Sequence, residues 1–274
     1  MTPIRKPADG FVSLAKNEID VMCSGINAAH FNLTARNLEA RIVAAMGIQP
    51  PMTTIPFMVR TDLWNDGSVR SGKDFRGRRI VLIAAGNASE IKLVNVLAAH
   101  GMTIKDVDVE FMSYNVMPIA FANKSIDIAI PSEPFATFIR QQGLAKILPE
   151  ESKVSAGELT TVLLFSDMFV RERREVGVRF LRTLLQTTPD LIGENWRTAR
   201  VLDVLAKWTG LKAQDIADGE FSVFDPNLDP SRYLDSIQRQ EKALLAMKRL
   251  QYDAPLKPDQ YLDASLVKDA ARRP

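Results

Sequence analysis

Cysteine and histidine are scarce in this chain. Its 274 residues include one cysteine, Cys23, and two histidines, His30 and His100. A single cysteine excludes an internal disulfide, and the chain shows no Cys/His spacing typical of a metal site. Cys23 lies at the end of a predicted strand, where a nucleophile could stand, but we interpret it as a small buried apolar residue. We expect His30 to pack within a helix and His100 to cap a helix end.

Long apolar runs and an excess of one charge are also missing. No run approaches the ~20 apolar residues of a membrane helix, and the first ten residues lack the apolar core of a secretory signal. The chain is therefore either cytosolic or begins downstream of an export signal. The 35 basic and 33 acidic side chains leave a net charge of +2, which gives no reason to expect nucleic acid as a partner.

The common catalytic and cofactor motifs are absent from the sequence. It contains no Gly-x-Ser-x-Gly, no phosphate-binding Gly-Lys-Ser/Thr loop and no Gly-x-Gly-x-x-Gly. We therefore expect neither enzyme activity nor a bound cofactor or metal. The composition, 46% hydrophobic and 25% charged, is that of a globular protein with a core.

One phrase occurs twice in the sequence. Residues 16–25 read KNEIDVMCSG and residues 123–134 read NKSIDIAIPSEP. Each copy consists of a polar helix end, an Ile-Asp turn, a short apolar strand, and small or polar residues that open another helix. Two α/β units that end alike indicate two lobes, with a ligand between their strand ends.

Strands and helices alternate most clearly in the middle of the chain. The pattern predicts an α/β fold with a mostly parallel sheet and helices on both sides, bounded near residues 61 and 157. We therefore assign residues 61–157 to lobe 2. Its strands are predicted at 78–84, 107–111, 126–130 and 145–148, and its helices at 90–100, 115–123 and 133–142.

The flanking segments, residues 1–60 and 158–274, are expected to form lobe 1. A strand at 159–165 is predicted to cross back into this lobe. The other strands are predicted at 19–23, 39–46 and 57–60, and the main helices at 11–17, 26–37, 172–186, 197–208 and 231–250.

Two turns that each follow a buried strand supply most of the predicted binding site. Residues 86–89 connect a strand to a helix, so backbone N–H groups and the positive helix end would face an anionic ligand. Residues 24–27 occupy the equivalent place in the other lobe. For the polar side chains of both turns, helix capping is the alternative role. The expected contacts are Ser24, Gly25, Asn27, Asn87, Ala88 and Ser89.

Glu133 and Tyr114 complete the predicted site. Glu133 directly follows an apolar strand, where its carboxylate could accept a hydrogen bond from an amine, amidine or aminopyrimidine. The alternative is an acid in the first turn of a helix, which the helix dipole favours. Tyr114 could stack on a flat ligand, and a surface or core position is its alternative.

The ordered segments of the middle region resemble those of a known family. DFRGRRIV at 74–81, GNAS at 86–89, KDVDV at 105–109, SIDIAIPSEP at 125–134 and Gly143 follow one another as in substrate-binding proteins of nitrate, sulfonate, taurine and pyrimidine-type ABC importers. The resemblance covers roughly Phe11 to Ala270. It implies a periplasmic-binding-protein fold, in which two α/β lobes joined by crossing strands close on a small ligand.

The same resemblance implies a function and its partners. The chain would be a periplasmic, monomeric solute-binding component of an ABC importer, which delivers a small anionic or zwitterionic nutrient to a membrane permease and its ATPase. A pyrimidine-precursor synthase on the same fold is the alternative. That enzyme branch relies on a cysteine-rich motif and several histidines, which this chain lacks.

The resemblance also exposes a departure from the family pattern. Members carry a strand, a helix and a second strand ahead of the segment that begins here near Phe11, besides an export signal. We expect either that the sequence is a fragment or a mis-started reading frame, or that a partner or unusual packing covers the gap in lobe 1.

Overall fold

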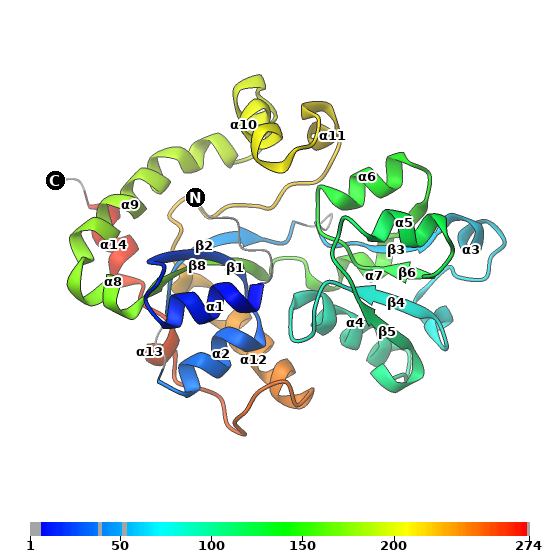
Figure 1. Ribbon diagram of the computed structural model, residues 1–274, viewed down its shortest axis with the longest axis horizontal. Helices are drawn as coiled ribbons and strands as arrows, with labels where there is room; N and C mark the ends of the chain where they lie inside the picture. Colours follow the sequence, from blue (N-terminus) through cyan, green and yellow to red (C-terminus); the bar gives the residue numbers. More distant parts are fainter. Residues whose placement is uncertain (1–6, 38–39, 51–53, 273–274) are drawn as a thin grey trace.

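The computed structural model describes residues 7–37, 40–50 and 54–272. Within these residues, the strands form two sheets, and helices pack against both (Figure 1). The strands are β1 (Val21–Gly25), β2 (Ala40–Ile48), β3 (Phe57–Arg60), β4 (Arg79–Leu82), β5 (Asp108–Phe111), β6 (Ile128–Ala129), β7 (Ala145–Leu148) and β8 (Leu159–Ser166). The helices are α1 (Pro7–Ala15), α2 (Ala28–Ala35), α3 (Thr61–Asn65), α4 (Ala88–Ala99), α5 (Met117–Ala122), α6 (Phe135–Gln141), α7 (Pro149–Ser152), α8 (Asp167–Glu172), α9 (Arg174–Thr187), α10 (Ala199–Thr209), α11 (Ala213–Ala217), α12 (Leu234–Ala246), α13 (Pro258–Tyr261) and α14 (Ser265–Ala271).

The first sheet has three strands in the order β1-β8-β2, with β8 antiparallel to both neighbours. The predicted crossing strand at 159–165 is therefore confirmed. Successive side chains of β8 point to opposite faces, so Leu164 packs in one apolar cluster while Leu163 and Phe165 pack in another. Because helices cover both faces, β8 is apolar along most of its length rather than alternating.

The second sheet has five strands in the order β5-β4-β6-β3-β7. Strand β4 is parallel to β5 and β6, which confirms the expected parallel pairing, whereas β3 is antiparallel to both β6 and β7. Residues 57–60, expected in lobe 1, thus pair within the sheet of lobe 2. Ile80 and Leu82 face the cluster that includes Leu93 of α4, and Val81 faces the cluster that includes Phe121 of α5.

The ends of two elements differ from the sequence prediction in ways that shape the site. Strand β1 begins at Val21 and ends at Gly25, two residues later than predicted, so Ser24 and Gly25 belong to the strand end itself. Helix α6 begins at Phe135, after Glu133 and Pro134. Helix α4 ends as predicted, with His100 as its C-cap and Gly101 at a φ of 67°.

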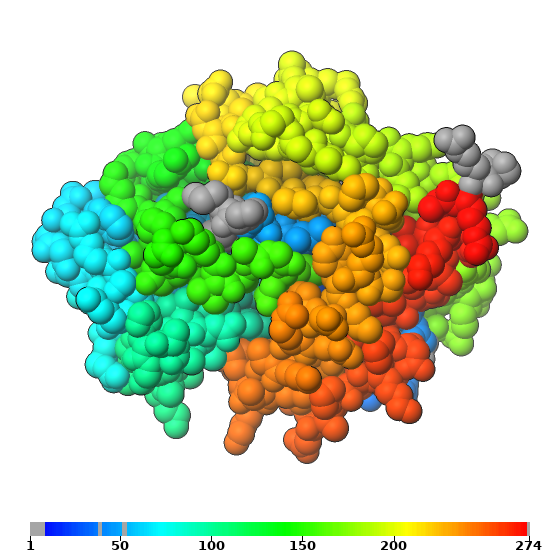
Figure 2. Space-filling view, turned by 180° about the vertical axis from the view of Figure 1, so that it is seen from behind, coloured from blue at the N-terminus to red at the C-terminus, as the bar shows by residue number. Residues whose placement is uncertain are grey.

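Helices α10 and α11 form a separate small cluster around buried Trp196, Val201 and Ile216. The space-filling view shows their yellow-green and yellow atoms along the top of the molecule, beside the green atoms of the second sheet's helices (Figure 2). Side chains of α6 make the contact: Arg140 donates to the Asp218 carbonyl at 3.1 Å and Gln141 to its carboxylate at 3.0 Å. The segment that follows α11 pairs with β2, where the Val223 N–H donates to the Ile48 carbonyl at 3.0 Å, so this arm contacts both sheets.

Candidate binding site

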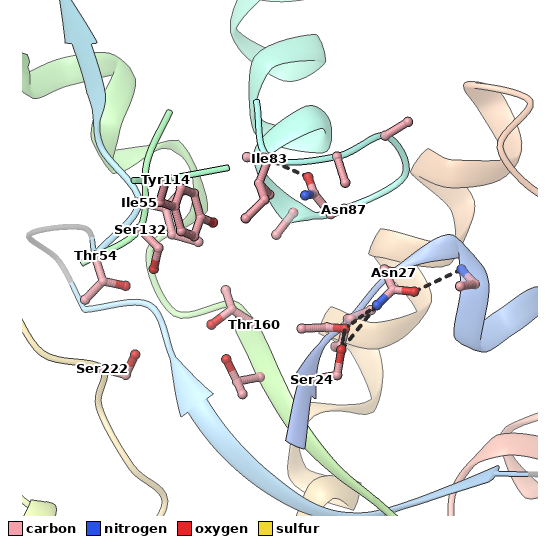
Figure 3. A pocket seen from close by; sticks show the side chains of 18 of the residues that line it. Ser24, Asn27, Thr54, Ile55, Ile83, Asn87, Tyr114, Ser132, Thr160 and Ser222 are labelled. Carbon is pink, nitrogen blue, oxygen red and sulfur yellow. Dashed lines mark hydrogen bonds between the residues drawn. The ribbon is translucent and has the colours of Figure 1, made fainter. Parts of the chain in front are cut away.

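A cavity of about 460 Å³ lies between the two sheets. Its wall includes the ends of β1 and β4, the first residues of α4, and the crossing strand β8 (Figure 3). The structure brings together seven of the eight residues predicted from sequence. The predicted residues that line the cavity are Ser24, Gly25, Asn27, Asn87, Ala88, Ser89 and Tyr114.

In the first turn, the polar groups bind one another. The Oδ1 atom of Asn27 accepts from the backbone N–H groups of Ala29 (2.9 Å) and His30 (3.3 Å), so Asn27 is the N-cap of α2. Its Nδ2 donates to the Gly25 carbonyl at 2.7 Å and lies 3.5 Å from the Ser24 hydroxyl. Asn27 therefore has the alternative role, that of a helix cap, and both the oxygen and the nitrogen of its amide are hydrogen-bonded within the protein.

In the second turn, a donor remains available. Asn87 caps α4 by accepting the Glu90 N–H at 3.1 Å and the Ser89 hydroxyl at 2.7 Å, both through Oδ1. Its Nδ2 has no hydrogen-bond acceptor within the described residues, and Figure 3 shows this nitrogen on the cavity side of the turn. Asn87 thus combines both predicted roles: its oxygen caps the helix, and its nitrogen faces the ligand space.

A buried ion pair supports the second turn from behind. Glu90 is 1% exposed, and its carboxylate accepts the Gly86 N–H at 2.6 Å. The same carboxylate pairs with Arg249 just beyond the end of α12, with Nε and Oε2 3.1 Å apart. The turn is therefore held to a helix that packs on the other sheet.

The two turns touch each other at one point. The Ala28 N–H donates to the Gly86 carbonyl at 2.8 Å. Gly86 has a φ of 71°, and a Cβ added there would lie 2.8 Å from the Ala28 Cβ. Only glycine fits both this backbone angle and this close approach.

Among the described residues, the cavity offers several hydrogen-bond donors but no charged side chain. Besides Asn87, four hydroxyl groups of the lining have no hydrogen-bond partner among the described residues: those of Tyr114, Ser132, Thr161 and Ser222. Burial raises the pKa of Tyr114 to about 12, so its hydroxyl keeps its proton at neutral pH. Every described residue of the lining is uncharged, which leaves donors and the α4 dipole to bind an anion.

Most of the remaining lining is apolar. Its larger members are Phe11, Ile26, Ile55 and Ile83. An apolar wall opposite neutral donors favours a ligand with an apolar body and a polar end over a small, fully hydrated ion.

Glu133 is the predicted residue that the structure places elsewhere. Its carboxylate accepts from the Thr137 N–H at 2.9 Å and the Thr137 hydroxyl at 3.0 Å, in the first turns of α6. It lines two smaller cavities beside the main one. Burial raises the pKa of Glu133, against the hydrogen bonds from Thr137 that lower it. Its contacts are those of the helix-terminal acid that the sequence offered as the alternative.

Five polar lining residues were missed by sequence reasoning: Thr54, Ser132, Thr160, Thr161 and Ser222. Ser132 lies within the repeated phrase, and Thr161 follows Thr160 inside an otherwise apolar strand, so both carried a signal. Thr54 and Ser222 lie between elements, and no local pattern marks them.

Cys23 is exposed on β1, not buried as expected. Ser24, the next residue of the strand, lines the cavity, so the alternation of β1 directs Cys23 to the other side. His30 is 1% exposed and lies 3.0 Å from the Ala40 carbonyl through Nε2, consistent with the expected packing role. No group of three or more potential metal ligands occurs among the described residues, nor does any described helix have the length and apolarity to cross a membrane.

The fold is shared with periplasmic binding proteins. The alkanesulfonate-binding protein SsuA from Xanthomonas axonopodis pv. citri, bound to MOPS, is 18% identical with a TM-score of 0.73 over 92% of this chain and 84% of that protein. The periplasmic nitrate-binding protein NrtA from Synechocystis PCC 6803 is 13% identical with a TM-score of 0.74, over 96% and 77%. The desulfurization enzyme DSZB is 17% identical with a TM-score of 0.63, over 92% and 85%.

This fold defines the class as periplasmic-binding-protein-like, with two α/β lobes around a cavity. Residues 33–194 match the NMT1/THI5-like family, and the chain belongs to this family. A comparison with curated protein sequences finds no match.

Proposed function

We propose that the protein is the solute-binding component of an ABC importer and captures an organic anion with an apolar body, such as an alkanesulfonate. The observation that carries the proposal is the cavity lining, in which five unpaired donor groups and an apolar wall surround a space without a described charged side chain. Uncharged donors at a helix N-terminus bind anions well. The sulfonate- and nitrate-binding proteins of the same fold support this choice.

The lining also distinguishes among the ligands that the family resemblance implies. The ammonium group of a zwitterion such as taurine would find no described carboxylate in the main cavity, since Glu133 binds Thr137. Nitrate has four heavy atoms and would leave much of a cavity of about 460 Å³ unfilled. An organosulfonate matches both the donors and the apolar wall.

Importer function implies the remaining parts of the proposal. The protein would act on the periplasmic side and deliver its ligand, as a monomer, to a permease and its ATPase. We place the lobe boundaries where the chain changes sheet, between β2 and β3 and between β7 and β8. The first boundary differs from the residue-61 prediction because β3 pairs with β6 and β7.

A thermal-melting panel with matched ligands tests the proposal. The panel contains hexanesulfonate, heptanoate, hexylammonium, taurine and nitrate, because the first three share a hexyl tail and differ in the charge or shape of the head. A ligand at 100 times its Kd stabilises the folded state by about 2.7 kcal/mol. Hexanesulfonate should therefore raise the melting temperature by several degrees, and hexylammonium should leave it unchanged. Equal stabilisation by hexylammonium, or none by any anion, would contradict the proposal.

The same samples separate binding from catalysis. A pyrimidine-precursor synthase and a desulfurising enzyme both convert their ligand, whereas a binding protein returns it. The described cavity lining contains neither Cys nor His, which supports binding. Mass spectrometry of hexanesulfonate after prolonged incubation should recover the compound unchanged, and a stoichiometric loss of it would argue for an enzyme.

A further inference from the structure

A second cavity of about 200 Å³ adjoins the main one beneath the α10–α11 arm. The two cavities share three lining residues, Thr54, Ser132 and Ser222, whose hydroxyl side chains mark the passage between them. Figure 3 shows Thr54, Ser132 and Ser222 together on one side of the main cavity, away from Asn27. A ligand bound in the main cavity can therefore continue in one direction, under the arm.

The wall of the second cavity is largely apolar. Leu205 of α10 and Ile216 of α11 lie on one side, together with Phe221 and Phe224 of the segment that returns toward β2. Phe221 stacks on buried Trp196, with ring centroids 4.8 Å apart, and on Phe224 at 5.8 Å. These ring contacts hold the wall in place, so the cavity is built into the arm's own apolar cluster.

Charge decides which end of a ligand enters this second cavity. Its only charged lining residues within the described chain are Glu133 and Glu220, both acidic. An anionic head would be repelled there, whereas the main cavity offers uncharged donors and the N-terminus of α4. The head therefore stays near Asn87, and the apolar end extends past Ser132 and Ser222.

We propose that the cavity beneath the α10–α11 arm is a tail subsite, which selects amphiphilic anions with a long alkyl or aryl group. This inference rests on the proposed function and adds to it the length of the preferred ligand. Burial of one methylene lowers Kd about fourfold. Affinity should therefore keep rising with chain length after the main cavity is filled.

A titration series measures this dependence. The probes are the linear alkanesulfonates from ethanesulfonate to octanesulfonate, titrated by calorimetry into the full chain. Leu205→Trp fills the second cavity from α10. Thr209→Trp does so from an exposed position of the same helix, and serves if the first variant folds poorly. Val204→Trp is the matched control, because Val204 is 52% exposed and lines neither cavity.

The expected result is selective loss of the long ligand. Octanesulfonate should bind at least tenfold more weakly to Leu205→Trp and Thr209→Trp than to the unchanged protein, while ethanesulfonate stays within twofold. Val204→Trp should leave both affinities within twofold. Melting curves identify a variant that is unfolded.

Three outcomes overturn the inference, and they differ from failure of the proposed function. Affinity that does not rise with chain length excludes a tail subsite, although short sulfonates still bind. A rise that survives in both cavity-filling variants places the tail elsewhere. Tighter binding of 8-aminooctanesulfonate than of octanesulfonate would show that Glu133 and Glu220 recognise a cation. If no sulfonate binds at all, the proposed function itself fails.

Discussion

The two turns that meet in the cavity each connect a strand to a helix, β1 to α2 and β4 to α4, but their polar groups bind different partners. Asn27 directs its amide oxygen to α2 and its nitrogen to Gly25. Asn87 directs its oxygen to α4 and leaves its nitrogen without a described acceptor. Both asparagines are helix N-caps, but their amide nitrogens differ. The nitrogen of Asn27 stabilises its own turn, whereas that of Asn87 is available to a ligand.

One asparagine side chain can therefore cap a helix and contact a ligand at the same time. An asparagine N-cap accepts backbone N–H groups through its side-chain oxygen. Its amide nitrogen donates to a nearby carbonyl where one is in reach and otherwise stays available. In the first turn, the carbonyl of Gly25 lies within 2.7 Å of that nitrogen. In the second turn, no described carbonyl accepts from the Asn87 nitrogen, and the Gly86 carbonyl accepts the Ala28 N–H.

Asn87→Asp should weaken anion binding at the second turn, and we expect this to be the largest effect of the substitutions considered. Aspartate caps a helix as well as asparagine does, so the fold should persist, but the carboxylate repels an anionic head. At 4 Å and an effective dielectric constant of 20 the repulsion is about 4 kcal/mol. Titration calorimetry should therefore show at least a hundredfold weaker binding of hexanesulfonate.

Asn123→Asp provides the matched control for this charge. Asn123 is exposed at the end of α5 and lines neither cavity. The same added charge there should change the affinity less than twofold. A similar loss in both variants would mean that net charge, and not the place of Asn87, controls binding.

The pH dependence of stability tests the structural role of the first turn, because the buried His30 follows Asn27 in α2. Burial lowers the pKa of His30 from 6.5 to about 4, because a buried imidazolium is poorly solvated. The unfolded chain takes up the proton first as the pH falls, so stability is retained above pH 6.5 and declines toward pH 4. The difference between the two pKa values corresponds to roughly 3 kcal/mol.

His30→Gln removes this titration. Urea unfolding at pH 7 and pH 4.5 should show a smaller pH-dependent loss for the variant than for the unchanged protein. If both proteins lose the same stability between these pH values, His30 is not neutral and buried as described.

Arg249→Met should destabilise the second turn by about 2 kcal/mol, because it leaves the Glu90 carboxylate buried without its cation. The guanidinium side chain is 38% exposed, so the effect should fall below that of a fully buried pair. Arg239→Met is the control, since Arg239 lies 3.8 Å from Glu158 and is 60% exposed. Urea unfolding should place the control within 0.5 kcal/mol of the unchanged protein, and equal effects would contradict a special role for Glu90.

Much of the fold could be predicted because local signals were strong. Residues 57–60 and 145–148 form strands with the predicted ends, and the Gly101 helix end is confirmed by its left-handed backbone. The pairing of β3 could not be read locally. Its apolar residues fit either sheet, and the choice depends on β6 and β7, which are about 70 and 90 residues away.

The site was predictable where strand ends carry it. Ser24 lies at the end of β1, Asn27 follows that strand, and Asn87 and Ser89 follow β4. The structure gathers these residues in one cavity. The helix at 197–208 was predicted, but the place of Ser222 was not, because only tertiary folding brings residue 222 beside the cavity residues of β8, Thr160 and Thr161. Glu133 lines the smaller cavities and not the main one, and Thr137, one helical turn later, donates to its carboxylate.

The most direct test replaces each asparagine by serine and measures hexanesulfonate binding by calorimetry. Serine keeps a capping oxygen at both positions and removes the amide nitrogen. A hydrogen bond to a charged group contributes about 1.5–3 kcal/mol, so Asn87→Ser should weaken binding at least tenfold, whereas Asn27→Ser should stay within twofold. Equal losses in both variants, or a larger loss in Asn27→Ser, would contradict the assignment of the anion to the second turn.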